Sequence, residues 1–324
     1  MIPPFKRKNR AFFLYLLLLL LPPYLLSAGD TLASLRVRAP ETATRGEVIR
    51  ILVEGMDIQE VTVDLRLPGS RDQVLYGFPV AAASTGQERW QVLGGVDHTV
   101  PGGDARLEIT VGTSTGRRHY QRVITIRERP FLSEEILLNA LLSDLRRTED
   151  PLRDQESREL WDLLHQVNRG SRYHSGTFIL PLEEFRRTST FGDRRVFRYS
   201  DDQVATSRHY GLDMAAPRGT PVRASARGRV VMAMDRIITG GSVVLEHQPG
   251  IYSIYYHLDQ VDVTAGTMAE QGDQLGTVGA TGLATGPHLH WEVRIGGVAV
   301  DPELFLRVPL VDMSGIAGAL SVVP

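Results

Sequence analysis

The sequence of 324 residues contains no cysteine. This absence excludes disulfide bonds, a thiol nucleophile, cysteine-ligated zinc or iron–sulfur sites, and lipid attachment at a lipoprotein cysteine. Any metal site in this chain must therefore be built from histidine, aspartate or glutamate.

The sequence also lacks an excess of either charge, because 36 basic residues stand against 38 acidic ones and the formal net charge is −2. A basic field of the kind that attracts nucleic acid is not expected, so we predict no nucleic-acid partner. At about 100–200 residues per domain, the length predicts two domains with room for a core in each.

Residues 1–28 have the pattern of a secretory signal. A basic cluster between Lys6 and Arg10 precedes the apolar run 11–21, which two prolines end. That run is shorter than the roughly 20 residues that a membrane-spanning helix needs. We therefore expect export to the periplasm or cell envelope, with cleavage after Ala28. An uncleaved inner-membrane anchor formed by residues 11–26 is the alternative, and it would be the only membrane contact.

Residues 31–128 alternate apolar and polar positions in short runs that glycine, proline and aspartate separate. Such runs predict a small β-sandwich domain of immunoglobulin-like type. Two histidines of this segment, His98 and His119, stand alone and are expected at the surface. The runs are residues 35–38, 48–53, 61–65, 107–111 and 122–126.

Residues 131–170 change to a helical period, and we expect a helical connector there. Ser133 is a candidate N-cap, and the apolar residues after it follow helical spacing. Pro151 interrupts this stretch, and a second amphipathic stretch covers residues 152–167. His165 and His174 are expected to be structural or exposed. The apolar residues of the first stretch are Ile136, Leu137, Leu141 and Leu145.

Residues 177–310 return to a β pattern, now rich in glycine, and a small apolar tail follows at residues 311–324. The window 205–300 holds 14 of the glycines and five of the nine histidines. Frequent glycine indicates tight turns and close backbone approaches. We therefore place the chemistry of the protein in this window.

The candidate metal ligands fall in two fragments of that window. His288 and His290 are two residues apart, so in a strand they face the same side. His209 and Asp213 are too far apart in a regular strand to share an ion, and Gly211 between them permits a bend. One later histidine with His209 and Asp213 would give two nitrogens, one carboxylate and an open position, which is the pattern of a catalytic zinc site.

Each fragment by itself is weak support for a metal. A histidine such as His257, at the end of a tyrosine-rich strand, is more often a surface residue. His247 has no matching feature and is expected to be structural or exposed. The fragments become informative together, because they occur in order with their glycine-rich surroundings.

Taken together, residues 190–302 resemble the lysostaphin-type, LytM-like zinc metallopeptidases that cut peptides of bacterial peptidoglycan. The resemblance implies a β-rich domain with an active-site groove, in which His209, Asp213 and His290 bind zinc. It also implies that His257 and His288 serve catalysis without binding the metal. Ala284 departs from the serine that the family often has. The segments that carry the resemblance are 191–194, 209–213, 215–217, 219–222, 256–258, 272–276, 279–282 and 286–292.

The resemblance implies an endopeptidase that hydrolyses peptide stems or cross-bridges of peptidoglycan, with metal-activated water and histidine acid–base catalysis. By analogy alone, a D,D-type cut is preferred over a cut in a glycine bridge. The alternative is a non-catalytic module that binds the cell wall or activates an amidase. A regulatory protein partner also stays open, as does self-inhibition by a charged loop at residues 194–208 or by the connector.

Overall fold

The computed structural model describes residues 35–82, 87–311 and 321–322. The predicted signal, residues 1–28, lies outside these ranges, so its cleavage or retention stays a prediction. Within the described part of the chain, no helix is both long and apolar enough to cross a membrane. Strands dominate the described residues, which confirms the predicted mainly β fold class.

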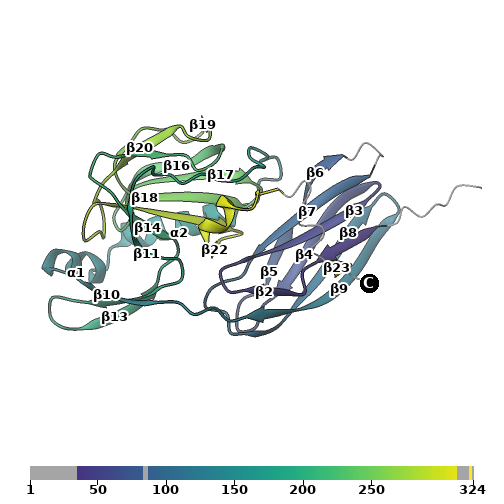
Figure 1. Ribbon diagram of the computed structural model, residues 1–324, viewed down its shortest axis with the longest axis horizontal. Coiled ribbons are helices and arrows are strands. Elements are labelled where there is room, and N and C mark those ends of the chain that lie inside the picture. The colour runs from purple at the N-terminus through teal and green to yellow at the C-terminus, as the bar shows by residue number, and fades with distance from the viewer. Residues whose placement is uncertain (1–34, 83–86, 312–320, 323–324) are drawn as a thin grey trace, which may run out of the picture. The chain divides into compact units, whose positions relative to one another are not determined.

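Two five-stranded sheets form the N-terminal part, where we predicted a sandwich (Figure 1). All neighbouring strands are antiparallel except β2 and β9. One sheet has the order β23 (Ser321–Val322), β1 (Arg36–Ala39), β3 (Val48–Gly55), β7 (Glu88–Gly95) and β6 (Phe78–Ala82). The other has the order β2 (Thr42–Thr44), β9 (Gly116–Arg127), β8 (Gly103–Thr113), β4 (Ile58–Arg66) and β5 (Gln73–Tyr76).

The two sheets are held together by apolar side chains at the alternating positions that the sequence predicted. Along β8, Leu107, Ile109 and Val111 are buried while the residues between them are not. Side chains two apart share a face of a strand, so one face of each sheet supplies a common apolar core. That core contains residues of both sheets, such as Ile51 and Ile109. The immunoglobulin-like type of the sandwich stays a prediction.

The tail after residue 310 is described only in part. Ser321 and Val322 form β23, which pairs with Arg38 and Ala39 of β1 and so extends a sheet of the N-terminal part. The segment that we predicted to be a small apolar tail thus contains a strand at residues 321–322, which the sequence analysis did not predict.

A ten-stranded antiparallel sheet forms the part of the chain where the chemistry was expected (Figure 1). Its main path is β11 (Arg186–Ser189), β14 (Leu212–Ala215), β21 (His288–Ile295), β18 (Ile251–Val261), β17 (Gly240–Gln248), β16 (Gly228–Arg236) and β19 (Met268–Ala269). The strands beside this path are β15 (Pro221–Arg223), β20 (Gln274–Val278) and β22 (Val298–Val300). A 3-10 helix, η1 (Pro302–Leu306), follows β22.

One face of this sheet packs into an apolar core, and the other face carries the candidate site. On β21, Leu289, Trp291 and Val293 are fully buried in the larger apolar core. The alternate residues of β21, which include His288 and His290, point to the opposite face. The helix α2 (Pro151–His165) covers part of that second face, because Leu164 packs against strand residues of β17 and β18. The part of this face that α2 does not cover carries the candidate site around His288 and His290.

The connector is not helical throughout, which corrects our prediction. Ser133 begins a strand, β10 (Ser133–Leu137), and is not a helix cap. The first helix, α1 (Ala140–Arg147), begins after Asn139, whose side chain accepts a hydrogen bond from the Leu142 amide. Backbone pairing overrides the helical spacing of the apolar residues, because β10 adds to β12 (Arg194–Arg198) in parallel.

A second correction concerns residues 194–208, which we expected to be a charged loop. They form a hairpin in which β12 pairs with β13 (Val204–Arg208). Together with β10 these strands make a three-stranded sheet in the order β10, β12, β13. The arginines of this segment therefore have fixed positions along strands.

His98 is a third correction, because it is buried and not at the surface. Its ring packs edge-on against Phe131, Phe191 and Tyr210, with ring centroids 5.4 to 6.1 Å apart. Burial lowers the pKa of His98, so the ring is neutral near pH 7. His119 is exposed, as expected.

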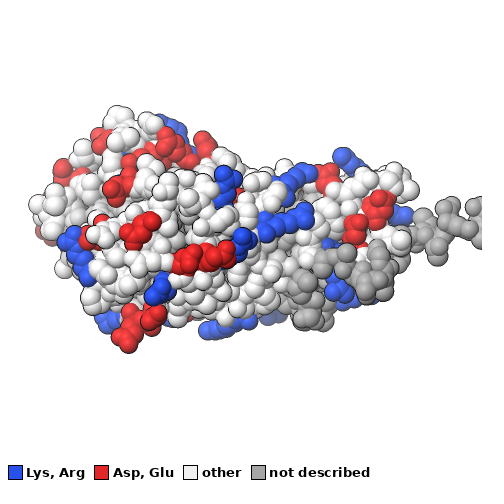
Figure 2. Space-filling view, turned by 90° about the horizontal axis from the view of Figure 1, so that it is seen from above, with Lys and Arg blue, Asp and Glu red and all other residues white. Residues whose placement is uncertain are grey.

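Acidic and basic side chains are interspersed on the face of the molecule that Figure 2 shows. Neither sign gathers into one large patch there. This agrees with the near-balance of charges in the sequence.

The sandwich core provides a test of this fold. Ile109→Ala removes a side chain that is 1% exposed, and we expect the free energy of unfolding to fall by about 2–5 kcal/mol through lost burial and a cavity. Val123→Ala on the neighbouring strand is the control, because Val123 is 57% exposed. Urea unfolding of both variants measures the difference, and equal losses would contradict the packing described here.

Candidate metal centre and active site

Strand pairing brings Asp213 and His290 together. In the antiparallel pair of β14 and β21, Asp213 lies directly opposite His290, and Ala215 lies opposite His288. Directly opposite residues of an antiparallel pair project to the same face, with Cα atoms about 4.5–5.5 Å apart. The register of two strands far apart in sequence therefore decides this contact.

His209 joins them from the short bend between β13 and β14. Gly211 is needed in this bend for a different reason from the one that we expected. A Cβ atom at Gly211 would lie 2.2 Å from the backbone oxygen of Trp291, so only glycine lets the chain pass this close to β21. Gly211 is not among the described glycines with positive φ.

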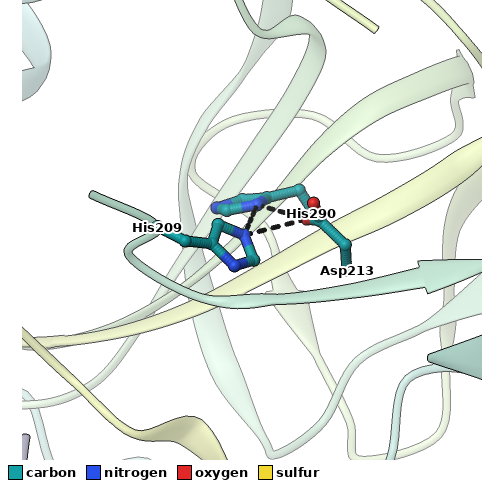
Figure 3. Close-up of side chains that lie close together, drawn as sticks. All are labelled: His209, Asp213 and His290. Atoms are coloured by element: carbon teal, nitrogen blue, oxygen red, sulfur yellow. Dashed lines mark hydrogen bonds and ion pairs between the residues drawn. The ribbon is translucent and has the colours of Figure 1, made fainter. Parts of the chain in front are cut away.

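Figure 3 shows the three side chains converging. The His209 Nε2 lies 3.0 Å from Asp213 Oδ1 and 2.9 Å from His290 Nδ1. The His290 Nδ1 lies 2.7 Å from the same Asp213 oxygen. All three residues are buried, with exposed fractions of 1%, 5% and 6% for His209, Asp213 and His290. These ligand atoms are close enough to surround one ion.

In His209 and His290, the ring nitrogen that points away from the site has its own hydrogen-bond partner. This partner decides which nitrogen of the ring faces the site without a proton. The His209 Nδ1 donates to the Thr190 carbonyl at 2.8 Å, and the His290 Nε2 donates to Glu292 Oε1 at 2.8 Å. These partners can only accept, so each outer nitrogen holds its proton. In the neutral rings, two nitrogen lone pairs and a carboxylate oxygen then meet at one point. Such a donor set fits a zinc ion and leaves room for further ligands.

The charges of the site support this arrangement. Burial by itself would raise the pKa of Asp213, but His209 and His290 hold it well below its usual range. Burial would also raise the pKa of Glu292, which Arg294 and His290 lower to about 2. For His290, the carboxylates of Asp213 and Glu292 outweigh burial and raise the pKa to about 9, so near pH 7 a cation that binds Nδ1 would displace a proton. Asp213 thus presents a negative charge to both histidines and Glu292 presents a second one to His290, which favours a cation at this place.

His257 reaches the same face by an irregularity of its strand. Tyr256 pairs with His290, so in a regular strand the next residue would point to the other face. His257 instead has a φ of +64°, which is uncommon for any residue other than glycine. The pairing shift around it shows an extra residue in β18, since β17 advances by two residues while β18 advances by three. The bulge turns the imidazole toward the site.

His257 and His288 lie side by side, with ring centroids 4.7 Å apart. Each donates from Nδ1 to a backbone carbonyl at 2.8 Å, that of Thr281 and that of Gly286 respectively. Each Nε2 is thereby left without a proton in the neutral ring. Burial and the neighbouring histidines lower the pKa of His257 to about 3, so this ring is neutral near pH 7.

A cavity of about 330 Å³ opens at these side chains. Four of the five predicted site residues line it directly, and His209 lies behind Asp213 and His290. Its walls include Ile136 of β10 and Phe197 of β12, so the connector contributes to the site. His247 is away from the cavity and is buried, with its Nε2 2.8 Å from Ser253 Oγ, in keeping with the expected structural role.

Several residues of the site were missed in the sequence. Glu292 and Arg294 alternate with His290 along β21, and this period-2 spacing was a signal that could have placed them beside the histidine. Thr281, which orients His257, lies in one of the segments that carry the family resemblance, but no role was predicted for it. The sequence near Glu134 and Arg195 gave no indication of a role in the site. These residues reach it only because β10 pairs with β12, which lies far away in the sequence.

Comparison with known proteins shows that the segment with these residues is similar to a family of peptidases. The model of peptidase family M23 matches residues 207–302. The DD-carboxypeptidase/endopeptidase Mpg of Neisseria meningitidis is 39% identical over 127 residues, which are 39% of this chain and 28% of that protein. The peptidoglycan DD-endopeptidase ShyC of Vibrio cholerae is 35% identical over 123 residues, which are 38% of this chain and 28% of that protein. The match thus spans little more than a quarter of each relative.

A further similarity, to a solved structure, extends over more of the chain. A crystal structure from Pseudomonas aeruginosa, described as that of a peptidase M23, has a TM-score of 0.54 at 25% identity and covers 81% of this chain and 94% of that one. The predicted fold of the C-terminal part is thereby confirmed. Residues 207–302 therefore resemble a peptidase family M23 domain, which confirms the family resemblance drawn from the sequence for this segment.

Proposed function

We propose that this protein is a zinc-dependent endopeptidase that hydrolyses peptide cross-links of bacterial peptidoglycan. The observation that carries the proposal is the convergence of His209, Asp213 and His290 beside the unprotonated Nε2 atoms of His257 and His288. The names of the two relatives, both of which include an endopeptidase activity, support the reaction class. The second name supports peptidoglycan as the substrate.

The chemistry follows from the proton positions. A zinc ion held by His209, Asp213 and His290 would supply Lewis acidity toward the peptide carbonyl and toward water. His257 and His288 each offer a bare Nε2 that can take a proton from the attacking water. As the carbon–nitrogen bond breaks, the same pair returns a proton to the leaving amine. The Nδ1 hydrogen bonds of the two rings are alike, so they assign the role of base to neither histidine.

We further propose that the protein works outside the cytoplasm, in the periplasm or cell envelope. The signal-like pattern of residues 1–28 supports this location. Peptidoglycan stems or cross-bridges are then accessible as substrate. The D,D-type cut is the preferred one, in line with the relatives' names.

The metal assignment predicts the effect of removing a ligand. His209→Ala and Asp213→Ala should each abolish both zinc binding and peptidoglycan hydrolysis, because two ligands cannot hold the ion in a catalytic geometry. Metal content by mass spectrometry and release of new amines from peptidoglycan measure the two effects. His119→Ala is the control, since His119 is exposed on β9. An Asp213→Ala protein without zinc but with full activity would contradict the assignment.

The acid–base assignment predicts a different outcome for His288. His288→Ala should retain zinc while turnover falls by about 10²–10⁴-fold, the usual contribution of a general acid or base. Zinc content and the rate on isolated cross-linked muropeptides separate these effects. Loss of zinc in this variant would instead make His288 a ligand.

A digest of peptidoglycan with and without a chelator tests the function as a whole. We expect mass spectrometry of the muropeptides to show cleaved cross-links, their absence after chelation, and their return when zinc is added. The same data identify the bond that is cut. A protein that holds zinc but releases no amines from any peptidoglycan would favour the non-catalytic regulatory alternative. The composition of the site does not support that alternative, since the three metal ligands and the two catalytic histidines are all present.

A further inference from the structure

Two residues outside the family-matched segment stand behind the candidate metal ligands. Arg195 of β12 donates from Nη2 to Asp213 Oδ2 and from Nε to Glu134 Oε1 of β10, the latter at 2.8 Å. The same glutamate oxygen accepts a hydrogen bond from Ser189 Oγ at 2.7 Å. Ser189 Oγ in turn lies 3.0 Å from Nδ1 of His209. A chain of hydrogen bonds thus connects His209 with Asp213 around the back of the site.

Strand geometry places this chain on the inner side of the three-stranded sheet. Glu134 pairs with Arg195 in the parallel register of β10 and β12. Side chains alternate along β10, so Glu134 is half-buried while Glu135 is exposed. Glu135 forms its own ion pair with Arg198 on the outer side. The same two strands therefore carry an inner pair at the site and an outer pair in solvent.

The division of the Asp213 oxygens shows what the inner pair can do. Both inner histidine nitrogens face Oδ1, whereas Arg195 binds Oδ2. Arg195 therefore leaves free the oxygen at which the histidines converge and prevents the carboxylate from rotating. The planar guanidinium presents several donors in a fixed fork, so it can bind two carboxylates at once. Glu134 balances its charge, which limits repulsion of a metal cation.

On the metal site proposed above, we infer that Glu134 and Arg195 are positioning residues for the metal ligands. Arg195 directs Oδ1 of Asp213 toward the ion. Glu134 holds Arg195 and also Ser189, which supports His209 from its outer nitrogen. Outer partners of this kind orient ligands and strengthen metal binding. The strand β10, from the segment expected to be a connector, is then part of the metal centre.

The inner and outer pairs allow a matched experiment on the full chain. Glu134→Gln and Arg195→Met alter the inner pair, and Glu135→Gln and Arg198→Met alter the outer pair in the same way. Zinc affinity is measured by competition with a chromophoric chelator. The ligand-field absorption spectrum of the cobalt-substituted protein reports the geometry of the ligands, which a change of fold stability alone would not shift.

We expect each inner variant to lower zinc affinity by about 10–100-fold and to change the cobalt spectrum. The outer variants should stay within about twofold of the unchanged protein, because they keep both ligands supported. The double variant Glu134→Gln/Arg195→Met should lose less affinity than the sum of the two single losses, because part of the effect of Glu134 passes through Arg195. Circular dichroism checks that each variant is folded, and Arg195→Lys replaces Arg195→Met if the latter is not.

The outcomes separate this inference from the proposed function. If the unchanged protein binds no zinc, the proposed function fails before the variants are compared. If it binds zinc and the inner variants bind equally well, the positioning role is wrong. Tighter zinc binding and faster hydrolysis in Arg195→Met would overturn it in the other direction, because Arg195 would then compete with the metal and inhibit the enzyme.

Discussion

The buried carboxylate of Asp213 is the group around which the site is organised. A buried anion is costly unless charges and hydrogen bonds compensate it. Here two histidines face one oxygen and an arginine binds the other. Glu292 repeats this arrangement one layer further out, between His290 and Arg294. Each anion therefore fixes the orientation of the cationic or neutral groups around it, and these groups build the candidate metal centre.

The sheet supplies the positions that this compensation requires. The pairing of β14 with β21 sets Asp213 opposite His290, and the absent side chain of Gly211 lets His209 approach from the bend. A bulge in β18 then brings His257 to the same face as His288. A regular β18 would have turned His257 to the other face, so this histidine joins the site only because of the bulge.

The fold could be predicted where the pattern is local. Alternating apolar residues indicated strands in the N-terminal part, and Leu107 and Ile109 indeed face one core. The prediction was wrong where a distant partner decides the structure. Ser133–Leu137 have helical spacing of apolar residues but form a strand, because β12 is available for pairing. His98 looked isolated in sequence but is enclosed by aromatic rings from distant segments.

For the site, the sequence by itself determined the residue types and their order. The absence of cysteine limited the metal donors to histidine and carboxylate, and period-2 spacing put His288 and His290 on one face. Only the tertiary structure decided which atoms face inward, because each proton position depends on a partner such as Thr190, Thr281 or Glu292. It alone also brought Glu134 behind Asp213. Side-chain spacing is local along the chain, whereas register and hydrogen-bond partners arise only when distant strands pair.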